Sequence, residues 1–408
     1  MASGQDFNVA SAITFGKGIM ILTVGLKWTF VLGTFGYIPY GWGLYMNSIK
    51  ENYVWLLLFG AAFCGISAGL FWSSEGSVFV IYPAPEERGK YLSAWAIITD
   101  RFLGPALGGA INLGINAKRI QGGSVDSNTY IVFAVLMCVG CGIAFLLPSP
   151  EKVERKDGSK VKVAPPVPVW DAIKAYWRSL TEKRILLLLP LFFFSFFYYA
   201  YMSAYLTRTF NVRSRAFSSL VSPMGGVLSS YLASLVLDSK RLKVRTKSTF
   251  LFFVLLFLQI GLWVWLLVIH YVYNNEYSHL DWSHNKFAIF YIPNILFFFN
   301  SYTGQSLFYW TVSNFSTELN ELTRYVSIIR SIESMGQSLS WILTSNAAGV
   351  DASGSGLIIV NLVGIVVSLG IASPIFLRLN HHKAKEYDDY FISEMSETSS
   401  EKSKEIEI

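Results

Sequence analysis

Apolar residues in this chain are grouped into long blocks that short polar stretches separate. Most blocks approach the roughly 20 residues that an α-helix needs to cross a hydrocarbon core about 30 Å thick. The blocks that predict clear membrane spans cover 28–46, 54–74, 92–114, 129–147, 185–206, 217–237, 249–273, 287–312 and 355–377. The pattern therefore predicts an all-α protein that crosses the bilayer many times.

Two further segments fit this pattern less well. The segment 325–346 carries Arg330, Glu333 and Gln337, so we expect it to face other helices or a wet cavity rather than lipid. The segment 9–25 is short and contains Lys17, which predicts an incomplete helix. With these two segments, we expect about five spans before the longest polar segment and about six after it.

That polar segment, 148–184, divides the chain into parts. It separates an N-terminal helical bundle, 28–147, from a C-terminal helical bundle, 185–377. The region 1–27 is expected to be an incomplete N-terminal helix region. The tail 378–408 is rich in Ser, Glu and Lys, so we expect it to be disordered.

The second part of the polar linker has a pattern of its own. Trp170, Ile173, Trp177 and Leu180 recur at helical spacing among basic residues, which predicts an amphipathic helix on the inner membrane surface. A solvated linker helix explains the same apolar stripe, and the sequence leaves both interpretations open.

Composition agrees with the span pattern. Hydrophobic residues make up 52% of the chain and charged residues only 15%, whereas soluble domains carry roughly a quarter charged residues. The net charge of +6 does not indicate a nucleic-acid partner, because Lys and Arg lie in short loops between apolar blocks. The partners that we expect are the lipid bilayer and either a small solute or another membrane protein.

The basic residues also predict the orientation, since positively charged loops stay on the cytoplasmic side. Placing 148–184 in the cytoplasm puts most of the Lys and Arg residues on that side. The basic residues that then lie outside are Lys50, Lys118, Arg119, Arg208, Arg213, Arg215 and Lys286. We therefore expect the N-terminus outside and the C-terminus in the cytoplasm, in a membrane that the sequence does not specify.

Several short motifs are more specific than the span pattern. They are 34–37 (TFGY), 63–76 (FCGISAGLFWSSEG), 82–83 (YP), 88–91 (RGKY), 107–114 (LGGAINLG) and 210–215 (FNVRSR). Together they resemble the uncoordinated-93-like branch of the major facilitator superfamily. The resemblance implies two six-helix halves and secondary transport of a small solute by alternating access between them. Relatives in this branch also serve as a channel-associated subunit and as a trafficking chaperone, so it allows a non-transporting membrane partner as well.

Relatives in that branch begin with a complete first helix and have a longer second helix. This chain keeps only 22–28 (LTVGLKW), the end of the turn that follows the second helix, without the acidic residue of that turn. We therefore expect a shortened form of a protein with twelve helices.

The sequence has no Walker loop, no metal-ligand spacing and no nucleophile elbow, so we expect no enzyme activity, no cofactor and no bound metal. Ionisable groups inside spans are the functional candidates instead, because they are costly to place in a membrane. They are Glu75, Asp100, Arg101, Arg330 and Glu333. Glu75 stands at a helix end, where we expect a gating salt bridge to Arg88 or its neighbours.

Spacing predicts partners for the other four groups. Arg330 and Glu333 stand at i and i+3, close enough to pair on one helix face. Asp100 is adjacent to Arg101 and is expected to help neutralise it. Such pairs occur in structural bridges and in substrate or proton sites, so both roles stay open.

A small-residue stripe follows in the predicted span 92–114. Gly104, Pro105, Gly108 and Gly109 form a core similar to the antiporter signature of many superfamily members, although Asp100 stands where that signature has a glycine. Glycines let helices approach closely, and proline removes a backbone donor and bends the helix. Helix packing without any antiport role explains the same residues.

The predicted span 287–312 is unusually polar. The residues that we take as candidate substrate contacts there are Asn300, Gln305 and Trp310. Polar helices should line the cavity, whereas the apolar spans 249–273 and 355–377 should face lipid. Amide side chains that only bridge neighbouring helices are the alternative.

Overall fold

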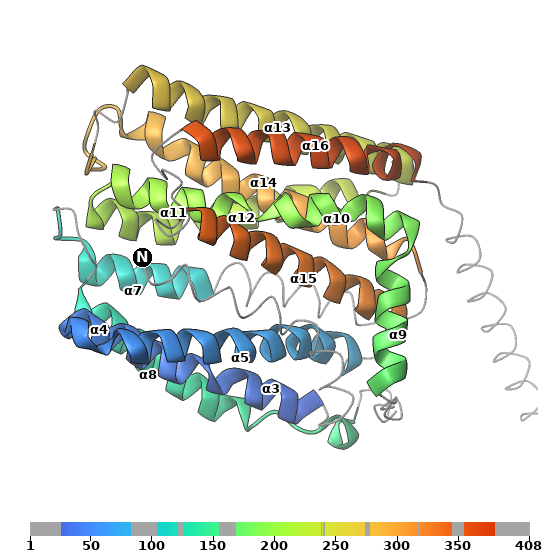
Figure 1. The fold of residues 1–408 in the computed structure, drawn as a ribbon, viewed down its shortest axis with the longest axis horizontal. Coiled ribbons are helices and arrows are strands. Elements are labelled where there is room, and N and C mark those ends of the chain that lie inside the picture. The colour runs from blue at the N-terminus through green and yellow to red at the C-terminus, as the bar shows by residue number, and fades with distance from the viewer. Residues whose placement is uncertain are drawn as a thin grey trace, which may run out of the picture.

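The computed structural model shows long helices that lie side by side in a bundle (Figure 1). It describes residues 26–82, 104–120, 126–154, 169–237, 239, 241–273, 278–316, 319–344 and 355–379. The regular structure within these ranges consists of helices. The apolar blocks of the sequence predict this fold class, and the structure confirms it.

The helices of the first half include a break that the span pattern misses. They are α3 (Leu26–Phe35), α4 (Tyr37–Ile49), η3 (Glu51–Tyr53), α5 (Val54–Ile81), α7 (Gly104–Asn116), α8 (Ser127–Ala144) and η6 (Pro150–Lys152). The predicted span 28–46 is therefore two helices. The break follows from Pro39, which has no N–H to donate to the carbonyl of Phe35, the last residue of α3.

The second half begins after the linker helix α9 (Val169–Leu180). Its helices are α10 (Lys183–Ser195), α11 (Tyr198–Thr209), α12 (Val212–Leu237), α13 (Val244–Tyr273), α14 (Phe287–Ser313), α15 (Leu319–Thr344) and α16 (Ser355–Arg378). The predicted span 185–206 is again two helices, α10 and α11. The weakly predicted span 325–346 is one continuous helix of 26 residues.

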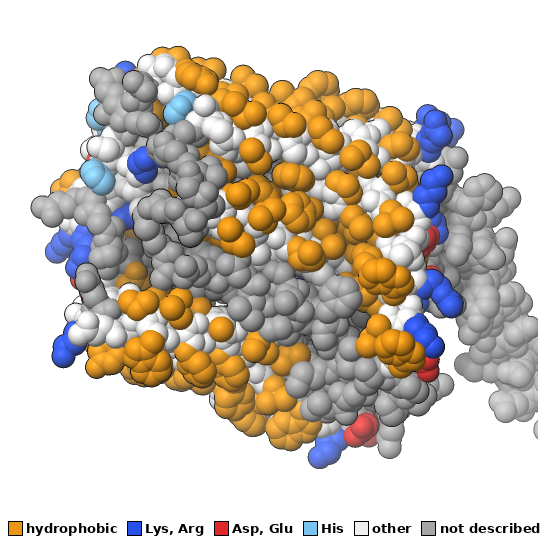
Figure 2. Space-filling view, viewed as in Figure 1, with side chains coloured by type: hydrophobic (Ala, Val, Ile, Leu, Met, Phe, Trp, Pro, Cys, Tyr) orange, Lys and Arg blue, Asp and Glu red, His pale blue; other side chains and the backbone are white. Residues whose placement is uncertain are grey.

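The surface of the bundle fits a membrane. Within the described ranges, six stretches are long and apolar enough to cross a bilayer, counting α10 and α11 together. Hydrophobic side chains cover the middle of the face shown in Figure 2, and Lys and Arg lie at its two ends. This distribution is typical of an apolar belt between two water-facing ends.

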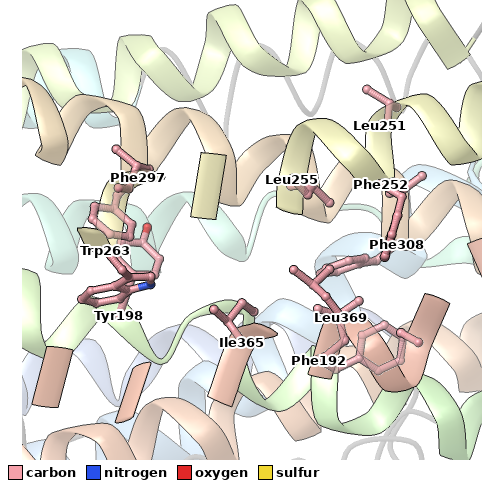
Figure 3. Close-up of a cluster of buried hydrophobic side chains, with 14 of the residues drawn as sticks. Phe192, Tyr198, Leu251, Phe252, Leu255, Trp263, Phe297, Phe308, Ile365 and Leu369 are labelled. Atoms are coloured by element: carbon pink, nitrogen blue, oxygen red, sulfur yellow. The ribbon is translucent and has the colours of Figure 1, made fainter. Parts of the chain in front are cut away.

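Two groups of helices lie beside each other in Figure 1. The first group contains α3, α4, α5 and α8, the second contains α10 to α16, and α7 packs on α12 between them. Buried side chains that include Phe192, Trp263 and Phe297 form the core of the second group (Figure 3). Helices α13 and α16 pack on each other along its outer edge (Figure 1), where the sequence predicts lipid-facing spans.

The linker helix α9 lies across one end of the second group, called the α9 end below (Figure 1). It is held to α15 by a 3.3 Å hydrogen bond between the hydroxyls of Tyr176 and Ser331, and Arg324 Nε donates to Ser179 Oγ at 3.2 Å. The apolar stripe of the sequence thus forms a helix, as predicted. The two tryptophans of α9 do not pack inward. Trp170 is 65% exposed and Trp177 is 58% exposed.

We predict that Trp170 and Trp177 lie in the membrane interface, because exposed tryptophans beside basic residues favour that position. A nitroxide label at W170C, with the natural cysteines replaced, should collide more often with lipid-soluble oxygen than with a water-soluble nickel complex. The control is D171C, on the polar face of the same helix. A label at this position should collide more often with the nickel complex than with oxygen. Equal preference for the water-soluble reagent at both positions would favour a solvated linker helix.

Candidate functional site

An ion pair lies near the middle of α15. Arg330 Nη1 and Glu333 Oε2 are 3.3 Å apart at i and i+3, as the spacing predicts. The Glu333 side chain is only 4% exposed, whereas the Arg330 side chain is 33% exposed. The carboxylate therefore lies within the protein, and the guanidinium lies nearer to a surface.

Other helices contribute polar groups to this ion pair. Ser195, the last residue of α10, donates a long hydrogen bond of 3.4 Å to Glu333 Oε1, and Gln305 of α14 donates to the same carboxylate. The Arg330 guanidinium lies over the ring of Tyr309, 5.6 Å from its centroid, a position typical of a cation–π contact. Ser195, Gln305, Tyr309, Arg330 and Glu333 are called the polar cluster below.

The break between α10 and α11 positions this cluster. The helical path ends at Ser195 and resumes at Tyr198. Ser340 Oγ of α15 donates to the carbonyl of Phe197 at the break, which satisfies a backbone group that lipid cannot satisfy. One turn along α15 from Glu333, a Cβ atom on Gly336 would collide with the Phe193 carbonyl. The glycine therefore lets α15 approach α10 closely enough for Ser195 to meet the carboxylate.

The cluster contains residues that sequence reasoning missed. Ser195 is the one polar residue in 191–197 (LFFFSFF), and that isolation within an aromatic run is a usable signal. Tyr309 is adjacent to the predicted Trp310, and nothing in the sequence indicates which of the two aromatic rings faces Arg330. Trp310 itself packs against the hydrophobic core of the second half.

Of the other ionisable and amide residues predicted for the site, the structure describes Glu75 and Asn300. Glu75 is buried at 8% exposure and lies inside α5 rather than at a helix end as predicted, because the helix continues to Ile81. Arg88, Asp100 and Arg101 fall outside the described residues, so the gating salt bridge to Glu75 stays a prediction. Asn300 is fully buried in α14 and lines a small cavity to which Ser195 also contributes.

The comparisons with known proteins identify the family. A family model described as Major Facilitator Superfamily matches residues 7–364. The chain belongs to the major facilitator superfamily. The match includes the two predicted bundles almost entirely, together with the linker between them, and it confirms the fold that the motifs imply.

Curated relatives within the superfamily agree with the predicted branch. The chain is 32% identical over 370 residues to the Notoamide biosynthesis cluster protein O' of Aspergillus versicolor, covering 88% of this chain and 79% of that protein. It is 27% identical over 356 residues to an UNC93-like protein of Schizosaccharomyces pombe, covering 83% and 69%. It is 26% identical over 332 residues to UNC93-like protein 1 of Arabidopsis thaliana, covering 78% and 70%. The two UNC93-like relatives support the uncoordinated-93-like branch.

Solved superfamily structures share the fold. A D-xylose-proton symporter superposes with a TM-score of 0.60 at 14% identity, covering 91% of this chain and 87% of that chain. A POT family transporter in complex with 5-aminolevulinic acid superposes with a TM-score of 0.59 at 13% identity, covering 92% and 87%. The family match and this shared fold together identify the chain as a transporter-like, integral multi-pass membrane protein.

In the superfamily plan α7 and α12 belong to different halves, and their contact is close. An added Cβ on Gly109 would lie 2.6 Å from Leu220 Cα and 2.7 Å from the Ser219 carbonyl oxygen. Asn112 Nδ2 donates to Ser219 Oγ at 3.0 Å, one turn along the same interface. Gly108 does not make the same close contact, because its added Cβ would meet only the Phe133 ring at 3.6 Å, and its packing role stays a prediction. Gly104 and Pro105 begin the described part of α7.

The end of the bundle opposite α9 carries a second ion pair. Arg213, at the start of α12, donates to both carboxylate oxygens of Asp281 in the segment before α14, and Asn211 Nδ2 donates to Asp281 at 2.8 Å. The Arg213 guanidinium lies over the Trp282 ring, 4.9 Å from its centroid. The hydrogen bonds from Arg213 hold the pKa of Asp281 well below its usual range.

We predict that Asp281→Asn lowers Tm at pH 7, because hydrogen bonds to a charged group contribute about 1.5–3 kcal/mol. A carboxyl whose pKa is lower in the folded state stabilises the fold above its unfolded pKa of about 4 and loses that contribution as pH falls further. Tm of the variant should therefore depend less on pH below 4 than wild-type Tm. The control is Asp171→Asn at an exposed position of α9. If Tm depends on pH in the same way in the two variants, this prediction is contradicted.

Proposed function

We propose that this chain is a secondary transporter that moves a small solute by alternating access between its two halves, with the polar cluster as part of the binding region. The observation that carries the proposal is the Arg330–Glu333 ion pair on α15. The Glu333 side chain is only 4% exposed, and the chain belongs to a superfamily of membrane proteins. Ionisable groups in that setting are expensive, and they commonly mark solute or proton pathways.

The chemistry of the cluster suits a small polar solute. Arg330 is partly exposed and presents a planar set of donors that fits carboxylate or other oxygen groups. The Glu333 carboxylate accepts hydrogen bonds from Ser195 and Gln305. Because a carboxylate has about four acceptor sites, it can also accept a hydrogen bond from a hydroxyl or amine group of a solute. A proton on Glu333 would weaken its hold on Arg330, and solute binding at Arg330 would then be coupled to that proton.

A non-transporting membrane partner, such as a channel-associated subunit or a trafficking chaperone, is the second candidate. Two relatives, at 27% and 26% identity, carry UNC93-like names rather than the name of a solute. In this alternative, the ion pair would only connect α15 with α10 and α14.

The decisive experiment measures flux through the full chain in reconstituted vesicles, with a panel of labelled sugars, amino acids and organic acids and with or without a pH gradient. We expect uptake above that of empty vesicles. Glu333→Gln should lose most of that uptake even when uptake is normalised to the amount of folded protein in the vesicles, because the amide keeps the shape of the side chain but not its charge. Glu321→Gln, three turns earlier on α15 and away from the cluster, is the matched control.

Failure of the transport proposal has a distinct result. If the wild-type chain is stable and moves no solute of the panel, while it purifies with one membrane protein in a fixed ratio, the second candidate replaces transport. If uptake occurs but Glu333→Gln matches Glu321→Gln, the protein transports and the cluster is only structural.

We also propose that the α9 end faces the cytoplasm, as the Lys and Arg distribution supports. Asn314, Phe315 and Ser316 form a glycosylation acceptor sequence at the end of α14, and α14 ends on that side of the bundle. We expect Asn314 to carry no glycan in a eukaryotic membrane, while an acceptor sequence inserted beside Trp282 should be used. Glycosylation of Asn314, seen as a mass shift removed by an endoglycosidase, would reverse the orientation.

A further inference from the structure

A small polar cavity lies inside the second half, among α10, α13, α14 and α16. It has a volume of about 20 Å³, and its polar lining comes from Ser195, Gln259, Asn300 and Ser301. Apolar side chains line the rest of it, and Figure 3 shows four of these, namely Leu255, Phe308, Ile365 and Leu369. Gln259 is a lone amide in the apolar stretch 250–269 of α13, a span predicted to face only lipid.

Two amide side chains in this cavity have unmet hydrogen-bonding groups. Among the residues that the structure describes, neither Asn300 Nδ2 nor Asn300 Oδ1 has a hydrogen-bond partner, and Gln259 Oε1 has none. Asn300 is 0% exposed and Gln259 is 7% exposed. Burial of such groups without partners is costly, so a small ligand that pairs with Asn300 Nδ2 and Gln259 Oε1 would stabilise the folded protein.

We propose that the cavity is a binding site for one buried water molecule that links Asn300, Gln259 and Ser195. The water accepts a hydrogen bond from Asn300 Nδ2 and donates to Gln259 Oε1 and Ser195 Oγ. Ser195 is an acceptor here because its own hydrogen is directed to the Phe192 carbonyl at 2.7 Å, or to Glu333. Three partners is the usual number for a buried water.

Size and chemistry select water over other ligands. A cavity needs roughly 10–15 Å³ to hold one water, and cavities that stay dry are lined by apolar groups alone. A cation would find the Oδ1 and Oε1 oxygens suitable. The Asn300 amide would also have to keep its Nδ2 donor away from that ion, although the donor has no other described partner.

The water connects the outer edge of the bundle to the polar cluster. Gln259 belongs to the peripheral helix α13, and Ser195 contacts Glu333 of α15. The bridge therefore couples α13 to α10 and α14 through hydrogen bonds rather than through apolar packing alone. This inference concerns the folded second half and does not depend on whether the protein transports a solute.

The test combines a density map with a double-mutant cycle. A map of the wild-type protein at a resolution that shows ordered water should contain one peak within hydrogen-bonding distance of Asn300 Nδ2 and Gln259 Oε1. Asn300→Leu and Gln259→Leu should each lower Tm by several degrees, because each leaves the other amide with fewer partners. The double variant should recover much of that loss, since an apolar cavity needs no water.

Asn361→Leu is the matched control for the cycle. Asn361 is buried in α16, but its Nδ2 already donates to the Leu357 carbonyl of its own helix at 2.8 Å. The loss of Tm from Asn361→Leu should therefore add to the loss from Gln259→Leu, and the double variant should recover none of it. A map with no peak in the cavity, or additive losses for Asn300→Leu and Gln259→Leu, would overturn the proposal. A Tm that rises with NaCl but not with choline chloride, and only when Asn300 is present, would replace water by a sodium ion.

Discussion

Arg330→Ala is expected to damage the protein more than the double replacement of Arg330 and Glu333 by Ala. The single change leaves the Glu333 carboxylate, which is 4% exposed, without its opposite charge. Removing one partner of a buried ion pair costs about 3–5 kcal/mol, whereas removing both leaves no buried charge. The double variant should therefore be closer to wild type in Tm, although neither variant keeps the cluster intact.

The measurement is thermal unfolding and membrane yield of the two single variants and the double variant. Arg245→Ala, at an exposed position near the start of α13, controls for the loss of an arginine as such and should leave Tm unchanged. Losses that simply add from Arg330→Ala and Glu333→Ala would show that the two residues act separately. In that case the pair could not be the basis of the proposed binding region.

Gly109→Ala is expected to reduce the amount of folded protein sharply. Its new Cβ atom would lie 2.6 Å from Leu220 Cα and 2.7 Å from the Ser219 carbonyl oxygen, and backbone atoms at that distance cannot move aside without separating α7 from α12. Overpacking of this kind typically costs about 1–3 kcal/mol, and occasionally more. A loss of contact between the two halves would add to that cost.

Gly108→Ala is the matched control, because it places the same methyl group one residue earlier on the same helix. That methyl would meet only the Phe133 ring, at 3.6 Å, which is ordinary van der Waals contact. Membrane yield and Tm of the two alanine variants, measured side by side, should separate clearly. Equal behaviour would mean that the α7–α12 contact is not a close backbone interface.

Local patterns in the sequence determined the class of the protein and part of the candidate site. Blocks of about 20 apolar residues predict spans because the thickness of the bilayer sets a length that composition alone reveals. The i, i+3 spacing places Arg330 and Glu333 on one helix face, and the structure confirms their contact. The break at Gly36 was not predicted, because a proline such as Pro39 does not always break a helix, and Pro190 and Pro223 stand inside α10 and α12.

Only the tertiary structure decided which distant groups meet. No proline explains the break between Ser195 and Tyr198. The Phe197 carbonyl at this break accepts a hydrogen bond from Ser340, which lies 143 residues further along the chain. Likewise, nothing local shows that Gly109 rather than Gly108 faces α12, or that Gln259 turns toward Asn300. These contacts depend on how each helix is rotated and how closely it approaches its neighbours. That geometry results from packing across the whole bundle, whereas periodicity within one segment fixes only which residues share a face.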